Sequence, residues 1–333
     1  MAVTQHDVAL RAGVSRPLVS LVMRNSPHVS EQKREAVLRA ASELGYRPNA
    51  HAAQLASRRS MHLGVILAEV ENPIFPQVLK SAEDVAESRG YAVLLSVSSL
   101  DAAVERSAVN RLLGHRVDGI VLVGTRLPAR EVQELAATLP VVTVSRRVAG
   151  VETVSVDDRA GAEAAVQHLL DLGHRRVAHI DGGKGPGARL RRRGYEAVMT
   201  RSGLAAHLNV VPGDYSEAGG VAGAERLLSG SRPPTAIFAA NDLTALGVMG
   251  AASRLGRRIP DDLAVVGFDN SPMCAYDYIG LTSVDQSPDA LGARGVSSLI
   301  RRISDPEAPF HSTLLNPSLE VRRTTVKASM SPS

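Results

Sequence analysis

The chain has 333 residues, enough for two or three domains, and 44% of them are hydrophobic, so it can bury a substantial core. Its one cysteine, Cys274, excludes an internal disulfide framework and is the usage expected in a reducing cytoplasm. We find neither a basic-then-apolar N-terminal segment nor an apolar run of about 18 residues, and we therefore expect no signal peptide and no membrane contact.

Positive charge is concentrated at the start of the chain. The net charge is +4, but residues 1–60 hold nine basic and four acidic residues, a balance of +5, and the rest of the chain has a balance of −1. A basic head on a near-neutral body indicates a polyanionic partner for the head. An ordinary solvated surface can carry the same charge, so this charge indicates DNA binding only together with the helix motif described next.

The N-terminal segment predicts two short helices joined by a tight turn. Thr4 and Asp7 have the capping-box spacing of a helix start, Gly13 ends this helix, and Ser15 begins the next. Two such helices, the second with an exposed basic N-terminal end, form a helix-turn-helix, whose second helix lies in the DNA major groove. The predicted outward positions of the second helix are Ser15, Arg16, Pro17, Ser20, Leu21 and Arg24.

A third helix and then a hinge are predicted beyond this motif. Ser30 can cap the third helix, apolar residues recur after it at helical spacing, and Gly45 is a natural end, so residues 1–46 make a helix-turn-helix domain. In residues 47–60, Asn49 can cap a short alanine-rich helix, which is too short to be stable alone in water. The segment is therefore either a flexible linker or a hinge that folds on DNA.

The remaining sequence alternates short apolar strands with helices. Strands are expected at 62–67, 91–95, 119–123, 141–144, 176–180, 209–211, 236–239 and 263–268. Helices are expected at 76–89, 104–113, 131–139, 160–172, 188–202, 217–229 and 242–255. Such alternation predicts parallel, doubly wound sheets, and two rounds of it predict two similar α/β lobes with a ligand cleft between them.

Motifs in both parts of the chain resemble those of the LacI/GalR repressors. Those of the head are Val3-Thr4, Asp7-Val8-Ala9, Ala12-Gly13-Val14-Ser15, Val19-Ser20, Val29-Ser30, Arg34 and Leu44-Gly45-Tyr46-Arg47-Pro48-Asn49. Those of the body include Asn72-Pro73, Val117-Asp118-Gly119-Ile120, Leu172-Gly173-His174, Asn241-Asp242 and Val265-Val266-Gly267-Phe268-Asp269. The resemblance implies an all-α helix-turn-helix head and an α/β body whose two doubly wound parallel-sheet lobes resemble periplasmic sugar-binding proteins.

The resemblance also implies which residues contact DNA. Arg16 and Pro17 match the family's principal base-reading positions, whereas Leu21 stands where many members have arginine. Leucine changes the available chemistry from guanine hydrogen bonds to apolar contact, for instance with a thymine methyl group. Leu55 matches a leucine that members insert into the minor groove, where an apolar wedge kinks DNA. The implied DNA-binding residues are Thr4, Ser15, Arg16, Pro17, Ser20, Leu21, Arg24, Asn49, His51, Ala52 and Leu55.

An effector site between the lobes is implied in the same way. Arg191 matches an arginine that grips ligand oxygens, and Tyr215 matches an aromatic platform for a sugar. The implied effector-binding residues are Phe75, Ser145, Arg146, Arg191, Tyr215, Asn241, Asp269 and Gln286. Donors, acceptors and a ring suit a polyhydroxy ligand. Two structural alternatives remain: an internal salt bridge of Arg191 and a turn cap formed by Asp269.

Two departures from the family pattern bear on the ligand. Ser145-Arg146 replaces the Asp-Arg of many sugar-binding relatives, and residues 96–99 lack the acid often found after the second strand. A less anionic pocket leaves open a less hydroxylated sugar, an acidic sugar, a phosphorylated sugar or another metabolite.

The sequence contains no complete motif for catalysis or for cofactor binding. Gly182–Gly187 looks like a phosphate loop but lacks the Gly-Lys-Ser/Thr ending, so we expect a flexible cleft loop. The ten histidines show no metal-ligand spacing, and no Gly-x-Ser-x-Gly is present. We predict neither an enzyme nor a cofactor nor a metal site.

The expected protein is a cytoplasmic, homodimeric repressor. Two heads would occupy half-sites of a near-palindromic DNA operator, and a carbohydrate-like effector bound between the lobes of residues 61–325 would release it. Residues 326–333 are expected to be a disordered tail that lacks the family's tetramerisation helix, so a dimer is predicted. A corepressor-dependent regulator is the main alternative, and a periplasmic-type solute receptor is a weaker one.

Overall fold

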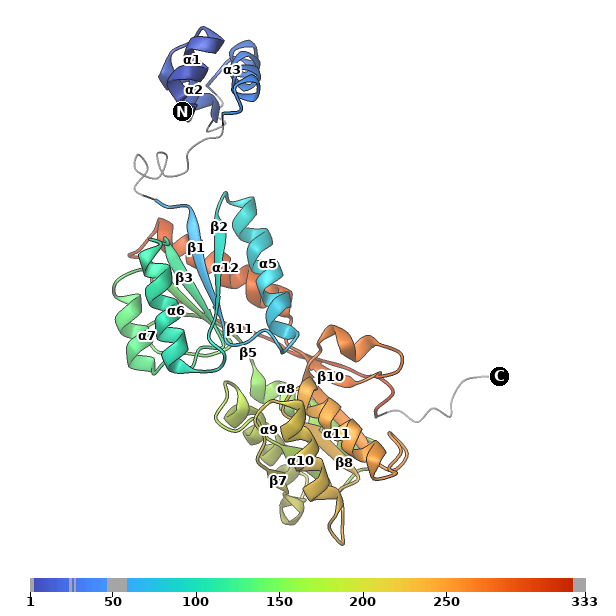
Figure 1. The fold of residues 1–333 in the computed structure, drawn as a ribbon. Coiled ribbons are helices and arrows are strands. Elements are labelled where there is room, and N and C mark those ends of the chain that lie inside the picture. Colours follow the sequence, from blue (N-terminus) through green and yellow to red (C-terminus); the bar gives the residue numbers. More distant parts are fainter. Residues whose placement is uncertain (1–2, 24–25, 27, 47–58, 326–333) are drawn as a thin grey trace. The chain divides into compact units, whose positions relative to one another are not determined.

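The protein is described here by a computed structural model, and it forms two compact units, residues 1–60 and 61–333 (Figure 1). The described residues are 3–23, 26, 28–46 and 59–325. Outside these ranges lie Arg24, residues 47–58 with the predicted hinge positions Asn49, His51, Ala52 and Leu55, and the predicted tail at 326–333.

Three helices form the N-terminal unit: α1 (Gln5–Ala12), α2 (Arg16–Met23) and α3 (Glu31–Glu43). The predicted capping box starts α1, because the backbone N–H and the hydroxyl of Thr4 donate to Asp7 Oδ2 at 2.8 and 2.7 Å. Gly13 ends α1 with a φ of +66°, a left-handed conformation that suits glycine. Ser30 precedes α3 as predicted, but its hydroxyl makes no capping hydrogen bond.

A small apolar core holds these helices together. Val8 of α1, Val19 of α2 and Val37 of α3 are fully buried, and all three belong to one apolar cluster. On α2 the buried residues are Val19 and Val22, so the opposite side of this helix faces outward. The predicted helix-turn-helix fold is confirmed.

The first lobe of the second unit is a six-stranded parallel sheet in the order β11-β5-β4-β3-β1-β2. Its strands are β1 (His62–Leu67), β2 (Ala92–Val97), β3 (Gly119–Val123), β4 (Val141–Val144), β5 (Glu152–Val156) and β11 (Ser312–Leu315). Its helices are α5 (Ile74–Ser88), α6 (Ala102–Gly114), α7 (Ala129–Ala136) and α12 (Pro288–Ser304). Apolar clusters cover both faces, with α5 and α12 on one and α6 and α7 on the other.

The second lobe repeats this plan in the order β12-β10-β9-β8-β6-β7, with β12 antiparallel to its neighbour. Its strands are β6 (Val177–Ile180), β7 (Val210–Val211), β8 (Ala236–Ala239), β9 (Ala264–Asp269), β10 (Thr282–Asp285) and β12 (Ser318–Glu320). Its helices are α8 (Asp158–Asp171), α9 (Ala188–Arg201), α10 (Glu217–Leu228) and α11 (Asp242–Arg254), with short 3-10 turns at Ala205–His207 and Pro272–Ala275. The two predicted parallel-sheet lobes are confirmed.

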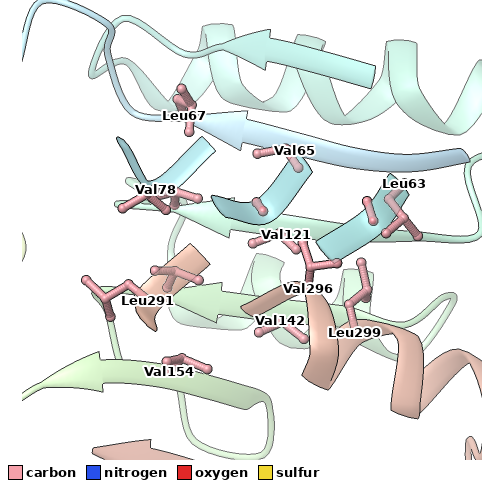
Figure 2. Packing of buried hydrophobic residues seen from close by; sticks show 14 of the residues in the cluster. Leu63, Val65, Leu67, Val78, Val121, Val142, Val154, Leu291, Val296 and Leu299 are labelled. Carbon is pink, nitrogen blue, oxygen red and sulfur yellow. The ribbon is translucent and has the colours of Figure 1, made fainter. Parts of the chain in front are cut away.

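The chain passes between the lobes after β5, after β10 and after β11. The predicted elements end at residue 268 and omit β5, so they miss this interleaving. Figure 2 shows how α12 returns from the end of the chain to the first sheet, where its side chains Leu291, Val296 and Leu299 face Val121 and Val142. In the described part of the chain, we find no helix with the length and apolarity needed to cross a membrane.

Truncation of Leu299 should weaken the first lobe selectively, because this side chain is 0% exposed in the core of that lobe. For Leu299→Ala we expect a loss of about 2–5 kcal/mol in unfolding free energy, the usual cost of a large buried cavity. Hydrogen exchange should speed up in β1 and β3 and stay unchanged in β8. The matched control, Leu172→Ala, removes a side chain that is 46% exposed and should change stability by less than about 0.5 kcal/mol. Equal effects of the two variants would contradict the packing of α12.

Candidate functional site

The outward face of α2 carries the predicted DNA-reading residues. Arg16 and Pro17 begin the helix and are exposed, Leu21 is 40% exposed, and Ser20 is half-buried. Ser15 is exposed directly before the helix, where its carbonyl accepts the N–H of Leu18 and Val19. An arginine and an apolar side chain on one exposed helix face can read base edges in a major groove.

The hydroxyl of Thr4, another predicted DNA contact, is used inside the capping box with Asp7. These hydrogen bonds, first that of the Thr4 side chain, lower the pKa of Asp7. Thr4 therefore fixes the first turn of α1 and favours the ionised form of Asp7 there.

An inner cavity of about 60 Å³ lies between the two lobes of the second unit. Its polar lining comes from Glu69, Asn72, Arg126, Ser145, Asp158, Arg191, Tyr215, Asn241, Asp269 and Gln286. Its apolar lining includes Ile74, Phe75, Val78, Leu100 and Pro186. Seven of the eight predicted effector residues meet here, and the exception is Arg146. The cavity is far smaller than an ordinary ligand pocket of about 300–1,000 Å³, because the protein's own side chains fill it.

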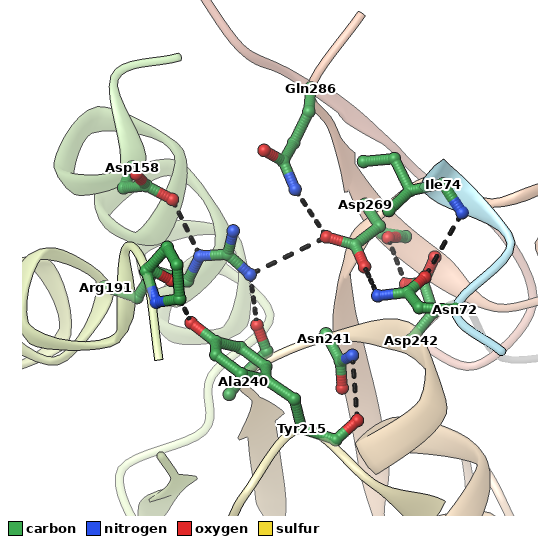
Figure 3. Close-up of polar contacts among 12 residues, drawn as sticks. Asn72, Ile74, Asp158, Arg191, Tyr215, Ala240, Asn241, Asp242, Asp269 and Gln286 are labelled. Atoms are coloured by element: carbon green, nitrogen blue, oxygen red, sulfur yellow. Dashed lines mark hydrogen bonds and ion pairs between the residues drawn. The ribbon is translucent and has the colours of Figure 1, made fainter. Parts of the chain in front are cut away.

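Arg191 of α9 lies at the centre of this lining (Figure 3). Its Nε donates to Asp158 Oδ1 at 2.8 Å, and its Nη1 donates to the carbonyl of Ala240 at 2.5 Å and lies 3.7 Å from Asp269 Oδ1. The guanidinium also stacks on Phe268, 3.6 Å from the ring centroid. Arg191 thus forms the internal salt bridge that the sequence left open, and it also lines the cavity. Its Nη2 atom has no hydrogen-bond partner among the described residues.

Asp269 ends β9 and ties the lobes together. Its Oδ2 accepts a hydrogen bond from Asn72 Nδ2 at 3.1 Å, and its Oδ1 accepts one from Gln286 Nε2. Asn72 belongs to the loop between β1 and α5 of the first lobe, so the Asn72–Asp269 bond crosses the cleft (Figure 3). Burial raises the pKa of Asp269 to about 7, although Arg191 opposes this shift.

Asp242 fixes the backbone next to Asp269. Its Oδ2 accepts the N–H and the hydroxyl of Ser271, both at 2.8 Å, and its Oδ1 accepts the hydroxyl of Ser283 at 2.5 Å. The bonds to Ser271 hold the loop that directly follows Asp269, the last residue of β9, which has a φ of +122°. Such a strained backbone persists only where its surroundings fix it.

Tyr215 is packed into the loop that the sequence suggested was flexible. Its hydroxyl donates to the carbonyl of Pro186 at 2.7 Å. A Cβ atom at Gly182 or Gly185 would lie 2.2 Å from the tyrosine ring, so these glycines make room for it. Asn241 donates to the Tyr215 carbonyl at 3.0 Å, while its Oδ1 caps α11. Asn241 therefore fixes Tyr215 as well as lining the cavity.

Arg146 lies outside the inner cavity, in a larger outer groove. Its Nη1 donates to the carbonyls of Thr125 and Leu127 at 3.0 and 2.5 Å. Conversely, Asp158 and Arg126 line the inner cavity but were not among the predicted site residues. Asp158 follows the strand β5, which was not predicted, and this hid its place at the cleft.

Among the residues that the structure describes, we see no cluster of three His, Cys, Asp or Glu side chains suited to a metal ion.

Comparisons with known proteins agree with this architecture. The family model described as "Bacterial regulatory proteins, lacI family" matches residues 4–49, and "Periplasmic binding protein-like domain" matches residues 166–325. Catabolite control protein A of Priestia megaterium is 34% identical over 331 residues, which cover 98% of this chain and 100% of that protein. A structure of the lac repressor dimer bound to operator and the anti-inducer ONPF has a TM-score of 0.85 at 30% identity, covering 98% of this chain and 100% of that chain. A LacI family regulator from Enterococcus faecium with bound ribose has a TM-score of 0.73 at 26% identity, covering 79% of this chain and 98% of that chain.

A helix-turn-helix unit joined to a two-lobed unit with a cavity between the lobes defines a DNA-binding transcriptional regulator with an effector domain. The chain belongs to the LacI family of bacterial regulatory proteins. Members of this family are regulators and not enzymes.

Protonation of Asp269 should make stability depend on pH. Its pKa in the folded protein, about 7, lies above the ordinary value of 3.8, so the folded state binds this proton more tightly than the unfolded state. The contribution of Asp269 to the unfolding free energy should therefore fall as pH rises from about 4 to about 7, whereas buried His179, whose pKa burial lowers to about 4, contributes in the opposite direction. Asp269→Asn should remove the falling contribution, so that the unfolding free energy rises more steeply with pH than in the parent protein, measured by urea unfolding at fixed ionic strength.

A residual slope is expected in that variant, because burial also raises the pKa of Asp242. The matched control is Asp277→Asn, at an exposed carboxylate outside the cavity, which should keep the slope of the parent protein. Equal pH profiles of unfolding free energy for Asp269→Asn and the parent protein would contradict this assignment.

Proposed function

We propose that this regulator is a cytoplasmic repressor that binds a near-palindromic operator as a homodimer and is released by a small sugar-like effector between its lobes. The observation that carries the proposal is the Asn72–Asp269 hydrogen bond at 3.1 Å, which joins the lobes inside the effector cavity. A ligand that takes over either partner changes the bonding between the lobes, and this is the differential interaction that an allosteric switch needs.

Sugar-like chemistry is supported by the lining of the inner cavity. Asn72, Asp269 and Gln286 offer donors and acceptors that ligand hydroxyls can replace, and Arg191 adds a charged donor. The rings of Phe75 and Tyr215 supply apolar surface for the C–H faces of a sugar. The Enterococcus faecium regulator with bound ribose supports the same class of ligand.

Exposed apolar side chains on the second unit support homodimerisation. Leu95 is 45% exposed on β2, an edge strand of the first sheet. Tyr276 and Tyr278 are 49% and 74% exposed and stack with ring centroids 5.7 Å apart. These side chains are available for a subunit contact, and the solved lac repressor is a dimer on its operator. Two copies present two α2 helices to two half-sites.

Effector binding should weaken operator binding. We would select a near-palindromic DNA for tight binding and titrate the protein at fixed salt, since phosphate contacts make affinity steeply salt-dependent. A panel of sugars, sugar acids and sugar phosphates should contain a compound that weakens binding about 5- to 150-fold, the usual range of allosteric coupling. Phe75→Ala removes a ring of the inner cavity without removing the bond between the lobes, and it should keep operator binding and lose this response. Phe310→Ala, at a 51% exposed ring outside the cavity, should keep both.

Tightening of the complex by the compound would make the ligand a corepressor and overturn the inducer assignment. Failure to bind any selected DNA above background would overturn the repressor assignment itself.

Leu21 should specify one base pair of each half-site by apolar contact. Leu21→Arg should shift the selected base at that position towards guanine, with discrimination of about 1–3 kcal/mol, because arginine donates to the O6 and N7 atoms of guanine. The matched control is Leu10→Arg, which adds the same charge at a 70% exposed position of α1. It should change overall affinity and leave base preference unchanged. Base selection on randomised half-sites measures both variants, and an unchanged preference in Leu21→Arg would contradict the assignment.

A further inference from the structure

An outer groove of about 1,010 Å³ adjoins the inner cavity. The two spaces share Arg126, Ser145, Asp158 and Pro186 in their linings, so the inner cavity and the groove lie next to each other. Both lobes contribute to the groove, since it takes residues from the loop after β3, the loop after β4, the start of α8 and the loop before α9. A ligand seated in the inner cavity can therefore extend into the outer groove.

Basic side chains dominate the outer groove. Six cationic side chains line it: Arg126, Arg146, Arg147, Arg159, Lys184 and Arg189. The acidic lining consists of Asp157 and Asp158. Asp158 pairs with Arg191 at 2.8 Å, and Asp157 caps α8 by accepting the N–H of Ala160 at 3.0 Å.

Five of these cations form no ion pair among the described residues, although Arg126 lies near enough to the Glu69 carboxylate to oppose the rise that burial causes in its pKa. Arg159 pairs with Glu163 at 2.8 Å, but no ion pair is formed by the other five within that part of the chain. Arg126 Nη1 donates to the backbone carbonyl of Lys184. Arg146 Nη1 donates to the backbone carbonyls of Thr125 and Leu127. The Nε atom of Arg126 is buried without any hydrogen-bond partner in the described structure. Like charges gathered in a cleft raise its potential and attract an anion.

The start of α9 adds to this field. This 14-residue helix begins after Gly187, which lines the groove, and it has no side-chain cap. Its N-terminus carries a partial positive charge, which favours an anion, although the N–H groups of Ala188 and Leu190 already donate to the carbonyls of Gly185 and Gly187. Guanidinium groups match the oxygens of phosphate with paired donors.

We propose that the effector is a phosphorylated sugar, whose sugar lies in the inner cavity and whose phosphate lies in the outer basic groove. This inference rests on the proposed effector function and names the ligand class of that site. A phosphate monoester carries up to two negative charges at neutral pH, which suits several unpaired cations better than a neutral sugar does. Ser145 and Arg126 stand where the two parts of the ligand meet, because both residues line both spaces.

The test compares matched pairs of probes by calorimetry on the full-length protein at fixed ionic strength. Each pair is a sugar and its phosphate ester, such as ribose with ribose 5-phosphate and glucose with glucose 6-phosphate. At least one ester should bind about tenfold or more tightly than its parent sugar. A sugar that binds as tightly as its ester, in every pair that binds, would overturn the inference.

Arg147→Gln and Arg189→Gln remove exposed cations of the groove that pack in no core cluster, so both variants should fold. Each should weaken binding of the ester about 3- to 10-fold and leave binding of the parent sugar unchanged. The matched control is Arg130→Gln on α7, where an 88% exposed arginine pairs with Glu134 away from the groove. Equal weakening by Arg130→Gln would show a general charge effect and would also overturn the inference.

The operator titration separates this inference from the proposed function. Release of the operator by a neutral sugar would retain the repressor and overturn only the phosphate site. Tight binding of an ester with no effect on operator affinity would retain the phosphate site and overturn the proposed switch.

Discussion

The structure of the effector unit depends on one buried charge, the guanidinium of Arg191. A buried cation is costly unless carboxylates and hydrogen bonds compensate for the lost water. Here Asp158, the Ala240 carbonyl and the ring of Phe268 surround it, with Asp269 3.7 Å away. Asp269 in turn bonds Asn72 of the other lobe, so satisfying Arg191 and joining the lobes are parts of one network. A ligand that enters this network competes with bonds that already hold the unit together.

The interleaved chain makes each lobe depend on distant sequence. The helix α12 returns to the first sheet after the chain has built most of the second lobe, and β11 extends the same first sheet. Buried Glu152 of β5 shows this dependence, because it pairs with Arg301 of α12 at 2.5 Å. Each of the three segments that cross between the lobes therefore begins in an element packed in one lobe and ends in an element packed in the other. A change in the cleft acts on segments whose two ends are held by these elements.

Local sequence predicted much of the fold and left out what depends on long-range pairing. The strand β1 forms at the predicted residues, His62–Leu67, because a strand buried on both faces shows a continuous apolar run in the sequence. The strand β5 holds three polar residues, and its buried Glu152 is explained by partners far along the chain, which are Arg301 and Arg302 of α12 and the N–H of His311. Elements after residue 268 lack long apolar runs and were missed for the same reason.

The candidate site was predictable to a similar degree. Resemblance to a family located Arg191, Tyr215 and Asp269, whose side chains meet in the inner cavity. It gave no sign of Asp158, because its role comes from the contact with Arg191 and not from its neighbours in sequence. The outer basic groove was likewise hidden, since Arg126, Arg146 and Lys184 come from separate loops that only the fold brings together.

The most direct test of the account is thermodynamic reciprocity between the two ligands of the full-length protein. The effector compound that releases the operator would be titrated by calorimetry into the free protein and into the protein–operator complex, at one salt concentration. Coupling through a shared equilibrium predicts that operator weakens effector binding by the same factor by which effector weakens operator binding. Equal effector affinities with and without operator would contradict the claim that a ligand between the lobes controls the binding of DNA.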